Sequence, residues 1–137
     1  MLLPTPTAAQ FHKATASSPQ QACVMVYRDN HRTLIWDDKL TDPGGSAAQP
    51  VPLRECLVLE HAQFEDLQQA IRSGSPDYGA LIITEKPGGF YEFSAAPECR
   101  AAAGTARLLF DHLEYTAFVH AVRHREFEQS AFLLSSI

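Results

Sequence analysis

The segment LVLEHAQFEDLQQAIRSG at residues 57–74 has the same pattern as LLFDHLEYTAFVHAVRHR at residues 108–125. In both, three apolar residues precede an acidic residue and a histidine, an aromatic residue follows three positions later, and an apolar helical pattern leads to an arginine. An offset of 51 residues (108 − 57) places His61 on His112. The matched positions are those that a buried helix face and its N-terminus constrain. The repetition predicts two equivalent helices, each preceded by a short strand.

The residues upstream of each helix are typical of a β-hairpin. ACVMVYRDNHRTLIWD (residues 22–37) and GALIITEKPGGFYEFS (residues 79–94) each hold an apolar run, a polar turn and a second run rich in β-branched and aromatic residues. These segments align at an offset of 57 (79 − 22), so the first unit carries six more residues (57 − 51) before its helix. The extra residues fall within 39–55, where Pro, Gly and Ser predict a loop.

Both helices have predicted ends. The first runs from about Glu60 to Ser73 and stops at Gly74, a residue suited to a left-handed cap. The second begins at Asp111, and Glu114 follows at the spacing of a capping box. The short strands are expected at residues 56–59 and 107–110. The residues expected to face the core are Phe64, Leu67 and Ile71 in the first helix and Tyr115, Phe118, Val119 and Val122 in the second.

These elements predict an α+β fold of tandem β-β-β-α repeats with one helix per repeat. A unit of about fifty residues buries too little apolar surface to be stable alone, so two units are expected to share one core. We predict an antiparallel-sheet pseudo-dimer with a pseudo-twofold axis, as a monomer or as a further homodimer. The predicted parts are an N-terminal tail at 1–10, the first repeat at 11–75, the second at 76–129 and an apolar C-terminal tail at 130–137.

The composition favours a globular protein that does not hold nucleic acid directly. The 137 residues are 45% hydrophobic and 20% charged, and 16 acidic against 11 basic residues give a net charge of −5. Binding to phosphate backbones needs a surplus of Lys and Arg on one face. A protein or small-molecule partner therefore fits the charge better than DNA.

Cysteine usage and hydropathy point to the cytoplasm. The three cysteines are an odd number with no CxxC spacing, which suits free thiols in a reducing compartment. The first residues, MLLPTPTAAQ, lack the basic start and the apolar length of a signal peptide, and no run approaches the ~20 apolar residues of a membrane span. We expect a cytoplasmic protein without membrane contact.

The first unit resembles the domain-of-unknown-function 397 family, the small actinobacterial domain typified by the BldB developmental regulators. FHKATAS (11–17) is similar to the opening segment of the family, CVMV (23–26) to its first strand, and LVLEHAQFEDL (57–67) to its closing apolar triplet and helix. In WDDKLTDPGG (36–45), Asp37 and Lys39 stand where the family has the Asp and Lys of a turn motif. The second unit matches only in hairpin and helix, because FSAAPECRAAAG lacks the Asp-x-Lys turn.

The resemblance implies a non-enzymatic domain that binds a helix-turn-helix regulator of the Xre type. Some pairs of this kind are proposed to act as toxin–antitoxin systems, which is the alternative function. A third alternative, from a different class, is a small-ligand or enzymatic domain that uses the cleft between the repeats. No cofactor and no metal are expected.

His61 and His112 are the residues that such a ligand cleft would use. Two histidines alone are an incomplete metal-ligand set, so packing of each ring on the preceding strand, or donation to a nearby carbonyl, is the favoured interpretation. The residues proposed for partner binding are Arg72, Arg123, Arg125, Asp37, Lys39 and Trp36. The arginines lie near helix C-termini, where cations also complement the helix dipole, and the Asp and Lys also suit a purely structural turn. For Trp36, packing in the core or at an interface is favoured over stacking on nucleic acid.

Overall fold

The computed structural model describes residues 6–7, 10–12, 24–37, 51–75 and 77–128. The elements in chain order are β1 (Val24–Arg28), β2 (Thr33–Asp37), the 3-10 turn η3 (Leu53–Glu55), β3 (Leu57–Leu59), α1 (His61–Ser73), β4 (Leu81–Lys86), β5 (Phe90–Ala95), the 3-10 turn η4 (Pro97–Cys99), α2 (Arg100–Ala103), β6 (Leu108–Phe110) and α3 (His112–Arg123). They include two three-stranded antiparallel sheets, sheet one ordered β1-β2-β3 and sheet two ordered β4-β5-β6. The predicted α+β class is confirmed.

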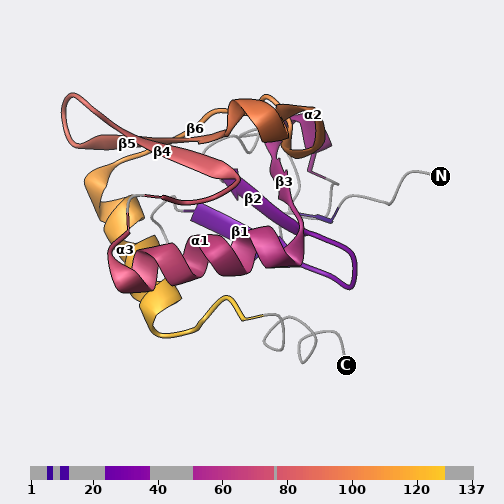
Figure 1. The fold of residues 1–137 in the computed structure, drawn as a ribbon, viewed down its shortest axis with the longest axis horizontal. Helices are drawn as coiled ribbons and strands as arrows, with labels where there is room; N and C mark the ends of the chain where they lie inside the picture. Colours follow the sequence, from indigo (N-terminus) through magenta and orange to yellow (C-terminus); the bar gives the residue numbers. More distant parts are fainter. Residues whose placement is uncertain (1–5, 8–9, 13–23, 38–50, 76, 129–137) are drawn as a thin grey trace.

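The two long helices and the two sheets enclose one core. Figure 1 shows α1 running across sheet one, with sheet two above it and α3 at the left. α1 contacts α3, and β2 of sheet one contacts β6 of sheet two. The buried residues of this core include Val26, Ile35, Leu57, Phe64, Leu67, Phe93, Phe110, Phe118 and Phe127. The predicted stripes on both helices face this core, with Tyr115 and Val119 partly buried at its margin.

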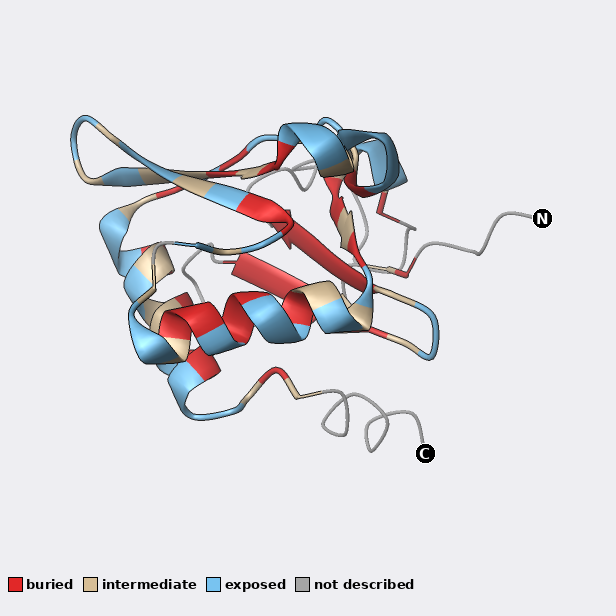
Figure 2. Ribbon diagram, viewed as in Figure 1, coloured by how far each residue is buried: buried red, intermediate tan, exposed pale blue. Residues whose placement is uncertain are grey.

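Sheet one is buried on both faces, whereas sheet two is open on one. A second apolar cluster covers the outer face of sheet one, and its buried members are Phe11, Met25, Leu34, Trp36, Val51 and Cys56. On sheet two, alternate side chains Ile82, Phe90 and Leu109 remain exposed. Figure 2 shows this contrast as buried β1 and β2 against β4, which has a buried start followed by intermediate and exposed residues. The covering residue Phe11 belongs to a segment that pairs with β1 through a β-bridge between His12 and Val26.

The helix ends follow the predicted local signals. Gly74 ends α1 with φ 76°, the left-handed conformation that glycine adopts without steric cost. At the start of α3, the Asp111 side chain accepts from the Glu114 N–H (2.7 Å), and Glu114 accepts in turn from the Asp111 N–H (2.8 Å). Because these interactions lie within a few residues of each other, the sequence pattern alone was enough to predict them.

The sequence prediction missed the short helical segment formed by η4 and α2. Pro97 begins it, an alanine run continues it, and Gly104 ends it with φ 98°. Proline at the first helical position and glycine after the last are helix signals that were available in APECRAAAG. The apolar tail predicted at 130–137 lies outside the described residues. So do residues 38–50, most of the loop predicted at 39–55.

Candidate functional site

Trp36 and Asp37, two residues predicted to bind a partner, lie in the interior. Trp36 is 2% exposed, and its indole N–H donates to Glu55 Oε1 (3.2 Å) while its ring lies 5.4 Å from the ring of Phe11. Asp37, the last residue of β2, is 4% exposed. The burial of Trp36 agrees with the favoured interpretation of packing in the core or at an interface, and neither side chain is accessible to a partner in this structure. Lys39 lies outside the described residues.

Arg28, the last residue of β1, forms a buried polar junction. Its side chain is 1% exposed, and the guanidinium lies 4.9 Å from the centre of the Phe64 ring. Nε donates to Thr33 Oγ1 (3.1 Å), and Nη1 donates to the Phe127 carbonyl oxygen (3.0 Å) and contacts Glu65 Oε1 (2.8 Å). One side chain thus ties β1 to β2, to α1 and to the chain that follows α3.

His61, at the first turn of α1, completes this junction. Its Nε2 lies 2.7 Å from the Asp29 carbonyl oxygen, which can only accept, so Nε2 is the donor. Nδ1 is left to accept from the Thr33 hydroxyl (2.9 Å) and from Arg28 Nη2 (3.3 Å). The ring is thereby fixed against the first hairpin. Of the two forms of the favoured interpretation, this structure shows donation to a nearby carbonyl.

His112 has different surroundings. It is exposed at the start of α3, with its ring 6.4 Å from that of Tyr91, which stacks on Tyr115 at 4.0 Å. Burial raises the pKa of Tyr115, and the neighbouring Tyr78 adds to the rise. Figure 1 places the first turns of α1 and α3 at opposite ends of the molecule. Within the described residues the two histidines contact separate sets of side chains, so the predicted shared cleft is not formed there.

Arg72, one of the residues predicted to bind a partner, joins the two long helices. Its Nε donates to the Val122 carbonyl oxygen near the end of α3 (3.1 Å), and Nη2 donates to Gln68 Oε1 and Glu128 Oε1, each at 3.4 Å. The side chain is 16% exposed. Its hydrogen-bonding capacity is therefore largely used inside the molecule.

Arg123 and Arg125 lie at the surface, where the sequence interpretation expected them. Arg123 is exposed in the last turn of α3, and the Arg125 side chain is 66% exposed while Nη1 contacts Glu128 Oε1 (3.0 Å). Leu113, in the first turn, is 65% exposed. The solvent side of this helix, called here the α3 outer face, consists of His112, Leu113, Thr116, His120, Arg123 and His124.

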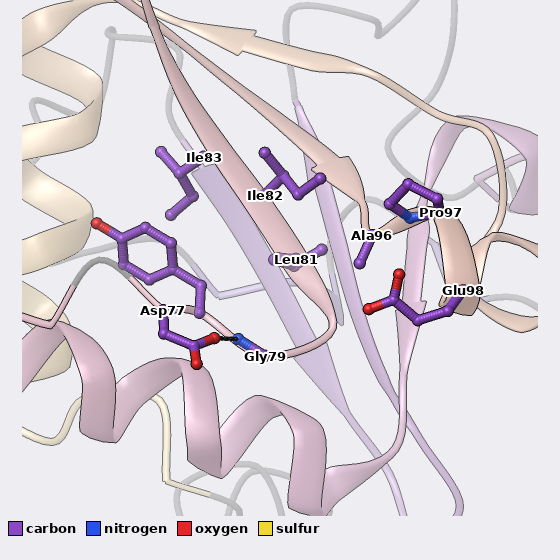
Figure 3. A pocket seen from close by; sticks show the side chains of 9 residues that line it. Asp77, Gly79, Leu81, Ile82, Ile83, Ala96, Pro97 and Glu98 are labelled. Carbon is purple, nitrogen blue, oxygen red and sulfur yellow. Dashed lines mark hydrogen bonds between the residues drawn. The ribbon is translucent and has the colours of Figure 1, made fainter.

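A hollow of about 260 Å³ lies beside β4. Figure 3 shows residues 77–79 and Ala96–Glu98 on either side of the start of this strand, with Asp77 Oδ1 accepting from the Gly79 N–H (3.1 Å). Two carboxylates, those of Asp77 and Glu98, line the hollow. The other lining residues are Tyr78, Gly79, Leu81, Ile82, Ile83, Ala96 and Pro97. The hollow has both polar and apolar lining, and neither histidine of the predicted cleft lines it.

Comparison of the chain with protein-family models, with curated proteins and with solved structures finds no match. In the described part of the chain, no three His, Cys, Asp or Glu side chains are grouped so as to hold a metal ion. None of the helices in that part is long and apolar enough to cross a membrane. The resemblance to the domain-of-unknown-function 397 family stays a prediction.

Cys56 is expected to be chemically inert in the folded protein. Burial raises the pKa of its thiol from 9.0 to about 12, and the nearby negative charge of Glu55 makes a smaller contribution to the same rise. Because only the thiolate is alkylated, a rise of three units (12 − 9) lowers its reactive fraction at neutral pH roughly 1,000-fold. Iodoacetamide labelling read by peptide mass spectrometry should modify the half-buried Cys99 first and Cys56 only after unfolding. Equal labelling rates at the two thiols would contradict this expectation.

Proposed function

We propose that the chain is a non-enzymatic, cytoplasmic protein-binding module that partners a helix-turn-helix regulator of the Xre type and modulates its activity. The resemblance of the first unit to its family supplies the class of partner. The net charge of −5 favours contact with the regulator over contact with DNA.

The observation that carries the proposal is the α3 outer face. Burial of an exposed leucine against a partner removes apolar surface from water and so favours association. Leu113 lies exposed in the first turn of α3, and Arg123 and His124 lie exposed at the other end of the same face. These groups would complement an acidic, partly apolar surface on the regulator.

The test captures the partner and then removes the leucine. The tagged chain is incubated with native lysate, retained proteins are identified, and any helix-turn-helix protein among them is purified and titrated by calorimetry. Leu113→Asp should weaken binding roughly 30-fold, since a central interface residue contributes about 2 kcal/mol. Leu53→Asp is the matched control, because Leu53 is also exposed but lies in η3. Retention of no DNA-binding protein, or equal losses for the two variants, would reject the proposal.

We also propose that the chain is a duplicated β-β-β-α unit arranged as a pseudo-dimer. The support is the same order of three strands and a long helix in each half, with the short helix α2 added in the second, and a matching register: Leu57 lies opposite Ile35, as Leu108 lies opposite Phe93. The helices of the two halves contact each other, as a pseudo-dimer requires. An experimental structure in which the halves do not superimpose would rule out this duplication.

A further inference from the structure

Strand β4 has a free edge in the described part of the chain. It is the outer strand of sheet two and pairs there with β5 alone. The Ala96 N–H donates to the Ala80 carbonyl oxygen (2.8 Å), so Ala80 turns its peptide groups toward the β5 side of the sheet. Bonding then alternates along β4, so every second residue turns its N–H and C=O away from β5. The residues with outward peptide groups are Leu81, Ile83 and Glu85.

The equivalent edge of sheet one is occupied by a segment of the same chain. The Val26 N–H donates to the His12 carbonyl oxygen (2.9 Å), and the His12 N–H donates back to Val26 (2.7 Å). Val26 holds the place on β1 that Ile83 holds on β4 at the offset of 57 residues (83 − 26). This type of edge therefore accepts an extended segment, and within the described residues β4 has none.

The chemistry beside β4 indicates what kind of segment would fit. The hollow described above adjoins the outward-facing peptide groups, and Asp77 and Glu98 line it without a basic residue among its lining. Glu85, farther along the same edge, is also exposed. The surface thus offers backbone hydrogen bonds, apolar contact with Ile82 and negative charge.

We propose that the free edge of β4 and the adjoining hollow bind an extended, basic segment of a partner protein. The segment adds to sheet two as a further strand and places a Lys or Arg side chain between Asp77 and Glu98. This inference rests on the proposed function, since it assigns a binding site to a segment of that partner. A second copy of the chain fits less well, because the same carboxylates would face each other. Residues 129–137 of this chain carry no basic side chain.

The first test uses synthetic peptides and the full chain. A labelled hexapeptide alternating lysine with valine should bind in fluorescence anisotropy, and one alternating glutamate with valine should not. Hydrogen exchange should show new protection at the amides of Leu81, Ile83 and Glu85. Equal binding of both peptides, or protection elsewhere only, would overturn the inference. Protection of the β4 amides in the absence of peptide would also overturn the inference. Protection that rises with protein concentration would assign the edge to a second copy of the chain, and protection that disappears when residues 129–137 are deleted would assign it to those residues.

Three variants separate the charge from the edge. Glu98→Gln and Asp77→Asn, which keeps the acceptor for the Gly79 N–H, should each weaken binding of the lysine peptide about two- to five-fold at low salt. Glu85→Pro removes one outward N–H together with one carboxylate and should reduce binding more than either single charge variant, with an unchanged melting temperature showing that sheet two persists. Glu55→Gln is the control, because it removes one charge beside sheet one and keeps an acceptor for Trp36. If Glu55→Gln lowers the affinity for the lysine peptide as much as Glu98→Gln does, the proposed site is contradicted.

The two proposals fail separately. If the regulator is captured by the chain but the lysine peptide does not bind, the β4 site is rejected and the proposed function stands. If the peptide binds at β4 but no DNA-binding protein is captured, the proposed function is rejected. Loss of regulator binding in Leu113→Asp together with unchanged peptide binding supports two distinct surfaces.

Discussion

Phe127→Ala is expected to lower the free energy of unfolding by about 3–5 kcal/mol, the usual cost of truncating a buried phenylalanine. Phe127 is 0% exposed and packs on Phe118 with ring centres 5.7 Å apart. It follows the end of α3, so its removal leaves a cavity where the chain returns to the core. Urea denaturation followed by circular dichroism measures the change, with a constant slope m indicating that the two-state analysis applies.

Phe90→Ala is the matched control for this variant. Phe90 lies on the open face of sheet two and is 40% exposed, so its loss should cost less than about 1 kcal/mol. If the two variants are equally stable, the placement of Phe127 in the core is wrong.

Arg28→Ala should cost about 2–4 kcal/mol, because it leaves buried hydrogen-bonding groups without their donor. The groups affected are the Phe127 carbonyl oxygen, the Thr33 hydroxyl and His61 Nδ1, and the packing of the guanidinium on Phe64 is lost as well. Arg28→Lys should recover little of this loss, since an ammonium group cannot reproduce the planar set of contacts. The same urea measurement reports both variants.

Glu65→Gln separates the hydrogen bonds of Arg28 from its ion pair. The Glu65 side chain is 46% exposed, so the Arg28–Glu65 contact (2.8 Å) is screened by water and its loss should cost at most about 1 kcal/mol. A larger effect for Glu65→Gln than for Arg28→Ala would mean that the ion pair, and not the buried bonds, stabilises this junction.

The two hairpins were predicted from local sequence patterns, but the difference in length between their turns was not. The alignment of the two hairpins at a constant offset of 57 residues does not allow for one additional residue in the second turn. Arg28 lies opposite Thr33, an offset of five (33 − 28), and Glu85 lies opposite Tyr91, an offset of six (91 − 85). The Asp29 side chain closes the first turn by accepting from the His31 and Arg32 N–H groups. In the second turn Gly88 and Gly89 take positive φ, so the two turns differ in length for chemical reasons.

Arg28 could have been found with a strict application of strand periodicity. Side chains alternate along a strand, so Val24, Val26 and Arg28 share the inner face of β1. Nothing else in the local pattern indicates this burial, because a buried cation is rare and the partners of Arg28 are distant in sequence. Packing of Trp36 in the core or at an interface was the favoured interpretation, but its cover, Phe11, belongs to a segment whose position no local pattern reveals.

The sequence by itself determined the elements whose causes are local: the strand pairs, the capping box of α3, the glycine end of α1 and the apolar stripes of both helices. These depend on interactions within a few residues, which a pattern of side chains records directly. Only the tertiary structure decided which face of each sheet is covered, that Arg72 joins two helices, and that Arg28 bonds to a carbonyl 99 residues away. Contacts of this range form because packing brings distant parts of the backbone together. The spacing of residues along the sequence does not predict which distant parts will meet.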